Sequence, residues 1–311
     1  MRGRRQREHD RTLCINIAGM ELRNPTMLAS GFLGVSQAIF NRLYNADVGA
    51  IVSKSISIES REGYRNPTAV CLEGGSYLNA VGLANPGAEA FSREIVSNQY
   101  VPIIVSLVGS SYHDFPPMIN KFDDLNILGY EVNLSCPHVD KMGMDVGDDP
   151  DMVTNVVKTV KSHTLKPVVV KVGIGNVDIL DIARAAYDAG ANAITAINTI
   201  RAMTINIESG IPALSNKIGG LSGKSVKPIA IRCVYEISKN VGVPVIGCGG
   251  IFSWEDAVEF MLAGASAIQL GSVIAYEGVG VFRKISLGLK RYLERKGLKN
   301  PAELVGLAHK Y

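Results

Sequence analysis

An amide, a hydroxyl, a thiol and an imidazole fall within the six-residue run Asn133-Leu134-Ser135-Cys136-Pro137-His138. The run follows a short extended segment, Tyr130-Glu131-Val132, and its proline stops further strand pairing. A thiol in such a turn can act as a nucleophile or as a base if its pKa is lowered from the ordinary value of about 8.5. Most cysteines are simply buried as small hydrophobic residues. The polar, proline-bounded turn nevertheless favours a catalytic role for Cys136.

Two lysines, Lys54 and Lys171, are flanked by apolar residues of predicted strands. Their ammonium groups should therefore be desolvated, and each should find an anionic or electron-rich partner. A lysine on a barrel strand can form a Schiff base, so an aldolase-type reaction at Lys171 is one interpretation. That chemistry gives no role to Cys136 or to the several asparagine amides. A flavin gives them one, because a lysine can steady the negative charge of the reduced ring while amides bind its polar edges.

The composition, 47% hydrophobic and 20% charged over 311 residues, is typical of a soluble globular protein. A net charge of +3 is too small to predict nucleic acid or an anionic membrane as a partner. No apolar run reaches the roughly 20 residues that span a bilayer. Residues 1–12 are predicted to be a disordered basic tail, because no apolar segment follows Arg4 and Arg5 as an export signal requires, and residues 13–311 should form one domain.

The five cysteines lie far apart and include no C-x-x-C pair. We therefore expect the chain alone to hold neither zinc nor an iron–sulfur cluster, and no other metal site is predicted. An odd count without an export signal predicts a reducing cytoplasm. Four of the five lie in apolar or strand contexts and are expected to serve packing: Cys14, Cys71, Cys233 and Cys248.

Eight short apolar runs rich in β-branched residues recur along the chain. Because they are continuous rather than alternating, they indicate parallel strands buried on both faces. The runs are Met27-Ser30, Ala50-Ser53, Ile103-Leu107, Tyr130-Cys136, Val168-Val172, Ala193-Asn198, Val245-Cys248 and Ala267-Leu270. Eight β–α units in succession predict an α/β fold of the (β/α)8 TIM-barrel class. A doubly wound open sheet is the alternative, but no early G-x-G-x-x-G follows the first strand.

Helical patterns fill the intervals between these strands. The predicted helices are Asp151 to Lys161, Val177 to Ala189, Trp254 to Leu262 with Ser253 as N-cap, and a basic amphipathic last helix, Arg283 to Lys299. Two stretches, residues 55–85 and 200–224, are too long to be simple connections. We expect them to form loops or small hairpins over the C-terminal face of the barrel.

Barrel enzymes take their catalytic residues from the C-terminal ends of the strands. Polar, reactive or glycine residues fall at seven of the eight predicted ends. Gly249-Gly250 and Gly271-Ser272, after strands seven and eight, let backbone N–H groups approach a phosphate. Gly219-Gly220-Leu221-Ser222-Gly223 should add a flexible turn rich in donors. Together they predict a phosphorylated ligand, although strand ends also use glycine simply for tight turns.

Several motifs spread along the chain occur together in one enzyme family. They are Asn133 to Pro137, Asn79-Ala80-Val81-Gly82-Leu83-Ala84-Asn85-Pro86-Gly87 and Lys54-Ser55-Ile56-Ser57. In this combination the chain resembles the class 1 dihydroorotate dehydrogenases. The run Asn216 to Gly223, followed by Lys227-Pro228-Ile229-Ala230, is similar to subclass 1B. The resemblance covers nearly the whole chain, from about Ile15 to Gly297.

The resemblance implies a barrel that binds FMN and oxidises dihydroorotate to orotate in pyrimidine biosynthesis. By position, Cys136 is the base that removes the C5 proton while a hydride passes from C6 to the flavin, so base and flavin lie on opposite faces of the substrate. The substrate would be held by Lys54, Asn79, Val81, Gly82, Leu83, Asn133, Asn198 and Thr199. FMN would contact Ser30, Lys54, Ser55, Asn133, Lys171, Ile197, Gly223, Gly249, Gly250, Gly271 and Ser272.

Subclass 1B also implies a second subunit, which carries FAD and a 2Fe–2S cluster and passes electrons to NAD. The assembly would be a heterotetramer built on a homodimer of this chain. The cysteine pattern agrees, because this chain does not supply the ligands of a cluster. Class 1A relatives, which use fumarate, share the same cysteine and lysines, so a fumarate-linked enzyme stays an alternative.

Two residues depart from the family pattern. His138 stands where the motif usually continues with asparagine, and Ser106 stands in place of a second asparagine. The histidine also occurs in the barrel domain of dihydropyrimidine dehydrogenase, which Gly143 and Asp149-Pro150 resemble, so redox chemistry on uracil or thymine is the alternative reaction. The run from Ile200 to Ile207 is similar to the dihydroorotate class instead. A non-enzymatic flavin carrier would need the cofactor residues but not Cys136.

Overall fold

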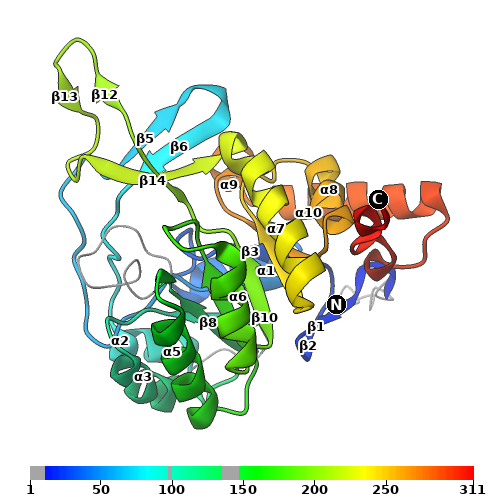
Figure 1. Ribbon diagram of the computed structural model, residues 1–311, viewed down its shortest axis with the longest axis horizontal. Coiled ribbons are helices and arrows are strands. Elements are labelled where there is room, and N and C mark those ends of the chain that lie inside the picture. Colours follow the sequence, from blue (N-terminus) through cyan, green and yellow to red (C-terminus); the bar gives the residue numbers. More distant parts are fainter. Residues whose placement is uncertain (1–10, 97–99, 135–146) are drawn as a thin grey trace, which may run out of the picture.

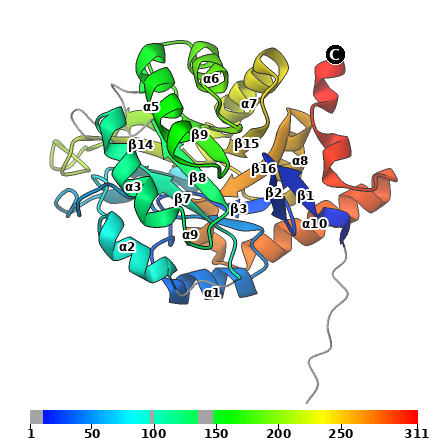
Figure 2. The same ribbon diagram turned by 90° about the horizontal axis from the view of Figure 1, so that it is seen from below.

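A computed structural model describes residues 11–96, 100–134 and 147–311. Eight parallel strands close into a barrel in the order β10-β15-β16-β3-β4-β7-β8-β9, with helices around them (Figures 1 and 2). The strands are β3 (Thr26–Leu28), β4 (Ala50–Val52), β7 (Ile103–Leu107), β8 (Gly129–Asn133), β9 (Val168–Val172), β10 (Ala193–Ala196), β15 (Val245–Cys248) and β16 (Ala265–Leu270). The predicted (β/α)8 barrel is therefore confirmed.

All eight predicted strands are present, and the main differences lie at their C-terminal ends. β8 ends at Asn133 rather than at Cys136, and β10 ends at Ala196 rather than at Asn198. The neighbouring β15 ends at Cys248, because Gly249 follows with a φ of 128° and redirects the chain. Asn198 and Gly249 thus lie just outside the hydrogen-bonded ladder, whereas Asn133 and Lys171 belong to it and pair with each other.

The helices surround the barrel, and one of them, α8 (Trp254–Leu262), begins where its predicted capping residue places it. Ser253 Oγ accepts from the N–H of Asp256, whose carboxylate accepts from the N–H of Ser253 in return, so α8 begins with a capping box. The last long helix stops at Lys296 instead of Lys299, because Gly297 adopts a left-handed conformation with φ of 68°. The helices are α1 (Gln37–Asn45), α2 (Ala88–Ile95), α3 (Phe115–Phe122), α5 (Pro150–His163), α6 (Ile179–Asp188), α7 (Lys227–Val241), α8 (Trp254–Leu262), α9 (Val273–Glu277) and α10 (Val281–Lys296).

Short 3-10 turns complete the described helical structure. They are η1 (Arg11–Leu13), η2 (Glu73–Gly75), η3 (Tyr112–Asp114), η4 (Lys224–Val226), η5 (Pro301–Leu304) and η6 (Leu307–Lys310). Among the described residues, no helix combines the length and the apolar character needed to cross a membrane.

The lower interior of the barrel is filled by apolar side chains. Met27, Val52, Ile104, Val169 and Ile246 belong to one fully buried cluster. The same cluster includes residues of a small hairpin, β1 (Ile15–Ile17) and β2 (Met20–Leu22), drawn in dark blue in Figure 2. The hairpin closes the N-terminal end of the barrel, which leaves the opposite end for a ligand.

The two long insertions form an additional sheet above the barrel, at the top of Figure 1. Its antiparallel order is β11-β14-β6-β5, with β5 (Ala69–Leu72) and β6 (Ser76–Asn79) from the first insertion and β11 (Ile200–Met203) and β14 (Ile218–Gly223) from the second. A hairpin of β12 (Ile205–Asn206) and β13 (Ile211–Pro212) projects beyond it.

The expectation of a flexible glycine turn over residues 219–223 is wrong. These residues form most of β14, which pairs with β6 on one side and β11 on the other. The glycines serve close approach instead of flexibility: a Cβ at Gly219 would lie 2.8 Å from the carbonyl oxygen of Asn79, and one at Gly223 would lie 2.4 Å from that of Gly75.

Candidate active site

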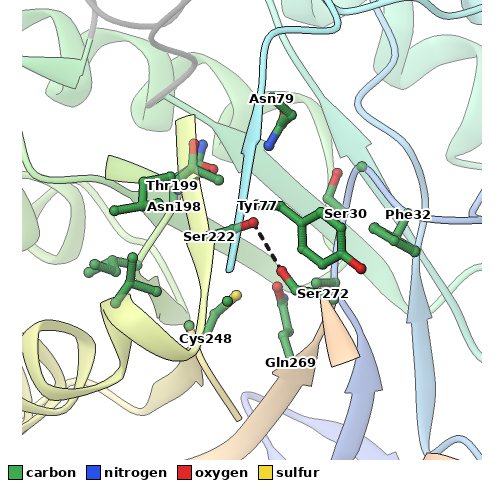
Figure 3. A pocket seen from close by; sticks show the side chains of 18 of the residues that line it. Ser30, Phe32, Tyr77, Asn79, Asn198, Thr199, Ser222, Cys248, Gln269 and Ser272 are labelled. Carbon is green, nitrogen blue, oxygen red and sulfur yellow. Dashed lines mark hydrogen bonds between the residues drawn. The ribbon is translucent and has the colours of Figure 1, made fainter. Parts of the chain in front are cut away.

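A cavity of about 380 Å³ lies between the C-terminal ends of the barrel strands and the additional sheet (Figure 3). It is lined by every predicted substrate or cofactor residue that the structure describes. These are Ser30, Lys54, Ser55, Asn79, Val81, Gly82, Leu83, Asn133, Lys171, Ile197, Asn198, Thr199, Gly223, Gly249, Gly250, Gly271 and Ser272. Cys136 and His138 lie outside the described residues. Segments far apart in the sequence therefore meet at one place.

Both predicted lysines reach the cavity from barrel strands. Lys54 follows β4, and burial lowers the pKa of its ammonium group, as its apolar flanks predict. Lys171 on β9 is only 4% exposed, and its Nζ lies 3.2 Å from Oε1 of Gln269 and 3.9 Å from Sγ of Cys248. Burial opposes the charged form of Lys171, but the acidic groups of Cys248 and Glu131 outweigh it and raise the pKa. The cavity thus contains two lysines whose surroundings shift their pKa values in opposite directions.

Hydroxyl and amide groups form a network across neighbouring strand ends. The Oγ of Ser55 lies 3.2 Å from the Oγ of Ser30 and 2.9 Å from that of Ser106, and it accepts from Nδ2 of Asn133 at 3.0 Å. Asn198 Nδ2 donates to Asn133 Oδ1 at 3.4 Å. Ser106, which departs from the family pattern, is fully buried behind Ser55 and does not line the cavity.

Glycines form another wall of the cavity, which includes the residues that follow β15. A Cβ at Gly250 would lie 2.7 Å from Cβ of Lys227 and 2.9 Å from the carbonyl oxygen of Gly223. Gly250 also has a φ of 76°, which favours glycine. The hydroxyls of Ser272 and Ser222 lie 3.0 Å apart at the same wall (Figure 3). This wall combines glycines, whose backbone no side chain covers, with small hydroxyls, and such a surface is suited to a phosphate.

The additional sheet and its flanking loop supply the roof. Asn79, at the end of β6, donates from Nδ2 to the carbonyl oxygen of Gly220 at 3.3 Å, which fixes its amide over the cavity. Tyr77 from the same strand also lines the cavity. Gly82 and Leu83 follow with φ values of 75° and 57°, so the backbone of this loop turns sharply at the cavity wall.

A model of the dihydroorotate dehydrogenase family matches residues 12–293. The chain belongs to the dihydroorotate dehydrogenase family. It is 44% identical to the dihydroorotate dehydrogenase B (NAD(+)) catalytic subunit of Methanocella arvoryzae over 95% of this chain and 97% of the relative. The corresponding subunit of Pyrococcus abyssi is also 44% identical, over 95% and 99% of the two chains.

A solved structure has the same fold. It is a dihydroorotate dehydrogenase of Eimeria tenella in complex with ferulenol, with a TM-score of 0.83 over 98% of this chain and 91% of that one. The sequence identity is 21%, so this comparison supports the barrel architecture alone.

The assignment of four cysteines to packing in this member of the family is partly wrong. Of these four described cysteines, Cys14 and Cys71 are exposed, whereas Cys233 and Cys248 are buried. Cys248 also lines the cavity, beside Lys171. As the last residue of β15 its side chain points into the barrel, and its apolar neighbours in the sequence concealed that direction.

Sequence reasoning also missed polar groups inside strands. Gln269 of β16 lines the cavity, and Glu131 of β8 lies below it. Both residues lie within runs that are otherwise mostly apolar, and neither has a role in the prediction from sequence. A polar residue in the middle of a buried strand was itself the signal, because such groups are retained only with a partner.

Proposed function

We propose that this chain is the catalytic subunit of an NAD-linked dihydroorotate dehydrogenase, which oxidises dihydroorotate to orotate in pyrimidine biosynthesis. The main support is one cavity that joins two lysines, three asparagine amides and a glycine-lined wall at the C-terminal end of the barrel. The names of the archaeal relatives support the same reaction.

The residues of the cavity fit FMN. Its volume of about 380 Å³ lies within the range of small-molecule sites. Gly249, Gly250 and Gly271, with Ser272, would bind the phosphate, since side chains at the first two positions would meet neighbouring atoms at 3.0 Å or less. Lys171 would face an electron-rich edge of the ring. When bound, FMN supplies the acceptor for a hydride.

The remaining polar groups suit a small anionic ring with amide edges. Asn79, Asn133 and Asn198 offer amides that both donate and accept, and Thr199 adds a hydroxyl. Lys54 would pair with the substrate carboxylate, which would restore the charge that burial of the ammonium group disfavours. These contacts would orient the substrate so that its C5 proton faces Cys136, the base that the family resemblance implies.

The relatives are named catalytic subunits, which implies a separate subunit for electron transfer. We propose that this partner carries FAD and a 2Fe–2S cluster, and that two copies of each chain form a heterotetramer. A cytoplasmic location stays a prediction from the sequence. The purified chain alone should bind FMN but reduce NAD poorly; efficient NAD reduction without a partner would overturn the two-subunit assignment.

Anaerobic titration tests the reaction itself. The purified, FMN-loaded chain should lose its flavin absorbance when dihydroorotate is added, and it should respond much less to dihydrouracil. Bleaching by dihydrouracil in preference would favour the dihydropyrimidine dehydrogenase alternative. A colourless protein that borohydride traps at Lys171 with a carbonyl compound would favour the aldolase alternative. Reoxidation by fumarate without a partner would favour the class 1A type.

A further inference from the structure

A polar layer separates the apolar interior of the barrel from the floor of the cavity. Glu131 on β8, Thr195 on β10 and Gln269 on β16 are each no more than 1% exposed. Oε2 of Glu131 accepts from Nε2 of Gln269 at 2.5 Å and from Oγ1 of Thr195 at 2.9 Å. Gln269 lines the cavity, whereas Glu131 and Thr195 do not. Glu131 therefore acts on the cavity only through other residues.

The contact with Glu131 determines which way the Gln269 amide points. A carboxylate accepts hydrogen bonds but does not donate them, so it selects the NH2 group of the amide. The carbonyl oxygen of Gln269 must then face the other way, and it lies 3.2 Å from Nζ of Lys171. The chain of contacts from Glu131 through Gln269 thus presents an acceptor to the ammonium group of Lys171.

The charges around Lys171 come from several strands. Glu131 belongs to β8, Cys248 to β15, and the second cation, Lys54, follows β4. β10 and β16 contribute the uncharged Thr195 and Gln269. Burial raises the pKa of the Cys248 thiol, and the nearby Lys171 acts in the opposite direction. Among the described residues, Glu131 is the carboxylate that reaches the ammonium group of Lys171 through Gln269, and its charge favours the ammonium form.

Stability alone gives little reason for a carboxylate at this depth. Removing an ionised carboxylate from water is costly, and pairing often only offsets that cost. Oε1 of Glu131 is buried and has no hydrogen-bond partner among the described residues. A neutral side chain would avoid this penalty. The charge of Glu131 is thus better explained by its effect on Lys171.

We propose that Glu131 is a positioning residue for the flavin site: acting through Gln269, it holds Lys171 charged and directed toward the polar edge of the bound ring. This inference rests on the proposed FMN site. It assigns a role to a residue that contacts neither substrate nor cofactor. Loss of the Glu131 charge should make Lys171 release its proton at lower pH, because an opposite charge nearby favours the ammonium form.

The test is the pH dependence of FMN affinity, measured by flavin fluorescence during titration of the flavin-free protein. Affinity should weaken in an alkaline transition when Lys171 loses its proton. Lys171→Met should abolish that transition and so distinguish it from ionisation of the flavin ring. In Glu131→Gln the transition should move down by about one to three pH units. An unchanged transition in a folded Glu131→Gln variant would overturn the proposal.

Asp123→Asn provides a matched control. Asp123 also accepts hydrogen bonds, from Tyr130 and Thr164, but these contacts lie on the outer side of the barrel. This variant should lose stability without moving the alkaline transition; an equal shift in Asp123→Asn would make the effect a general consequence of destabilisation and would overturn the proposal.

A second variant covers the case in which Glu131→Gln does not fold. Gln269→Leu removes the acceptor of Lys171 and should move the transition in the same direction; a transition at the wild-type pH would count against the proposal. Failure of the proposed function gives a different result, since the wild-type protein would then bind no FMN at all.

Discussion

The amide of Asn133 donates to the hydroxyl of Ser55 at 3.0 Å and so connects the ends of β8 and β4 across the intervening strand β7. The β7 residue between them, Ser106, lies 2.9 Å from the same hydroxyl. Ser55 is therefore a junction for three strand ends. Its position explains how small polar side chains can fix the direction of the Asn133 amide.

Ser55→Ala should weaken FMN binding and raise the KM for dihydroorotate. The substitution removes the acceptor of the Asn133 amide and a partner of Ser106, at a cost of about 1–3 kcal/mol in the free energy of unfolding. Ser286→Ala is the control, because Ser286 is equally buried and its Oγ has no hydrogen-bond partner among the described residues. Urea unfolding and flavin titration of both variants check this, and equal behaviour would refute it.

Two glycines with the same φ allow the cost of backbone strain to be measured separately from the cost of a steric clash. Gly250 and Gly242 both have a φ of 76°, but nothing lies within 4 Å of a Cβ built on Gly242. Gly242→Ala should therefore cost only the left-handed strain, about 1–2 kcal/mol. Gly250→Ala should add about 1–3 kcal/mol from overpacking and lower FMN affinity at least roughly tenfold. If both variants retain FMN equally, Gly250 does not shape the phosphate site.

Cys136→Ala should leave FMN binding intact and slow flavin bleaching by dihydroorotate about 10²- to 10⁴-fold, the usual contribution of a general base. Stopped-flow reduction measures this effect directly. Cys233→Ala is the control, since Cys233 is buried on α7 and does not line the cavity. An unchanged bleaching rate in Cys136→Ala would assign the base role to another group.

The pair of Lys227 and Asp256 should stabilise the fold at neutral pH more than in acid. Nζ of Lys227 lies 2.7 Å from Oδ1 of Asp256 and joins α7 to α8. Burial alone would raise the pKa of Asp256, but Lys227 and the N–H groups of Phe252 and Ser253 lower it overall. A lowered native pKa gives stability that is present above the unfolded pKa, about 3.9, and is lost as the pH falls through the native value.

Asp256→Asn should thus lower the free energy of unfolding by about 1–2 kcal/mol at pH 7 and by much less near pH 3. Denaturant unfolding at both pH values checks the sign. Glu236→Gln breaks a more exposed pair with Arg232 on α7 and should change stability by less than about 0.5 kcal/mol. A pH-independent loss in Asp256→Asn would mean that the cap geometry, and not the charge, stabilises this junction.

The barrel was predictable because continuous apolar runs and short intervals are typical of buried parallel strands. The cavity residues were predictable because chemistry-bearing side chains collect at strand ends, and the family resemblance then gave them expected roles. The roles of Cys248, Gln269 and Glu131 were not predictable, because the inward or outward direction of a strand residue depends on the register of the strand. A shift of one residue reverses it. The β14 strand was missed because its glycines hide the strand pattern, and only the pairing with β6 explains them.

The pairing of β3 with β16 has a consequence for how the chain is made. Thr26 lies beside Ile268, so the first barrel strand receives its second neighbour only when nearly the whole chain has left the ribosome. Until then the growing sheet carries two unpaired edges, which invite association with other chains. We expect a chain that ends at Gly264 to aggregate or to be degraded rapidly by protease, whereas the full chain resists. During synthesis of this protein, the risk of aggregation therefore persists until the last barrel strand emerges and closes the sheet.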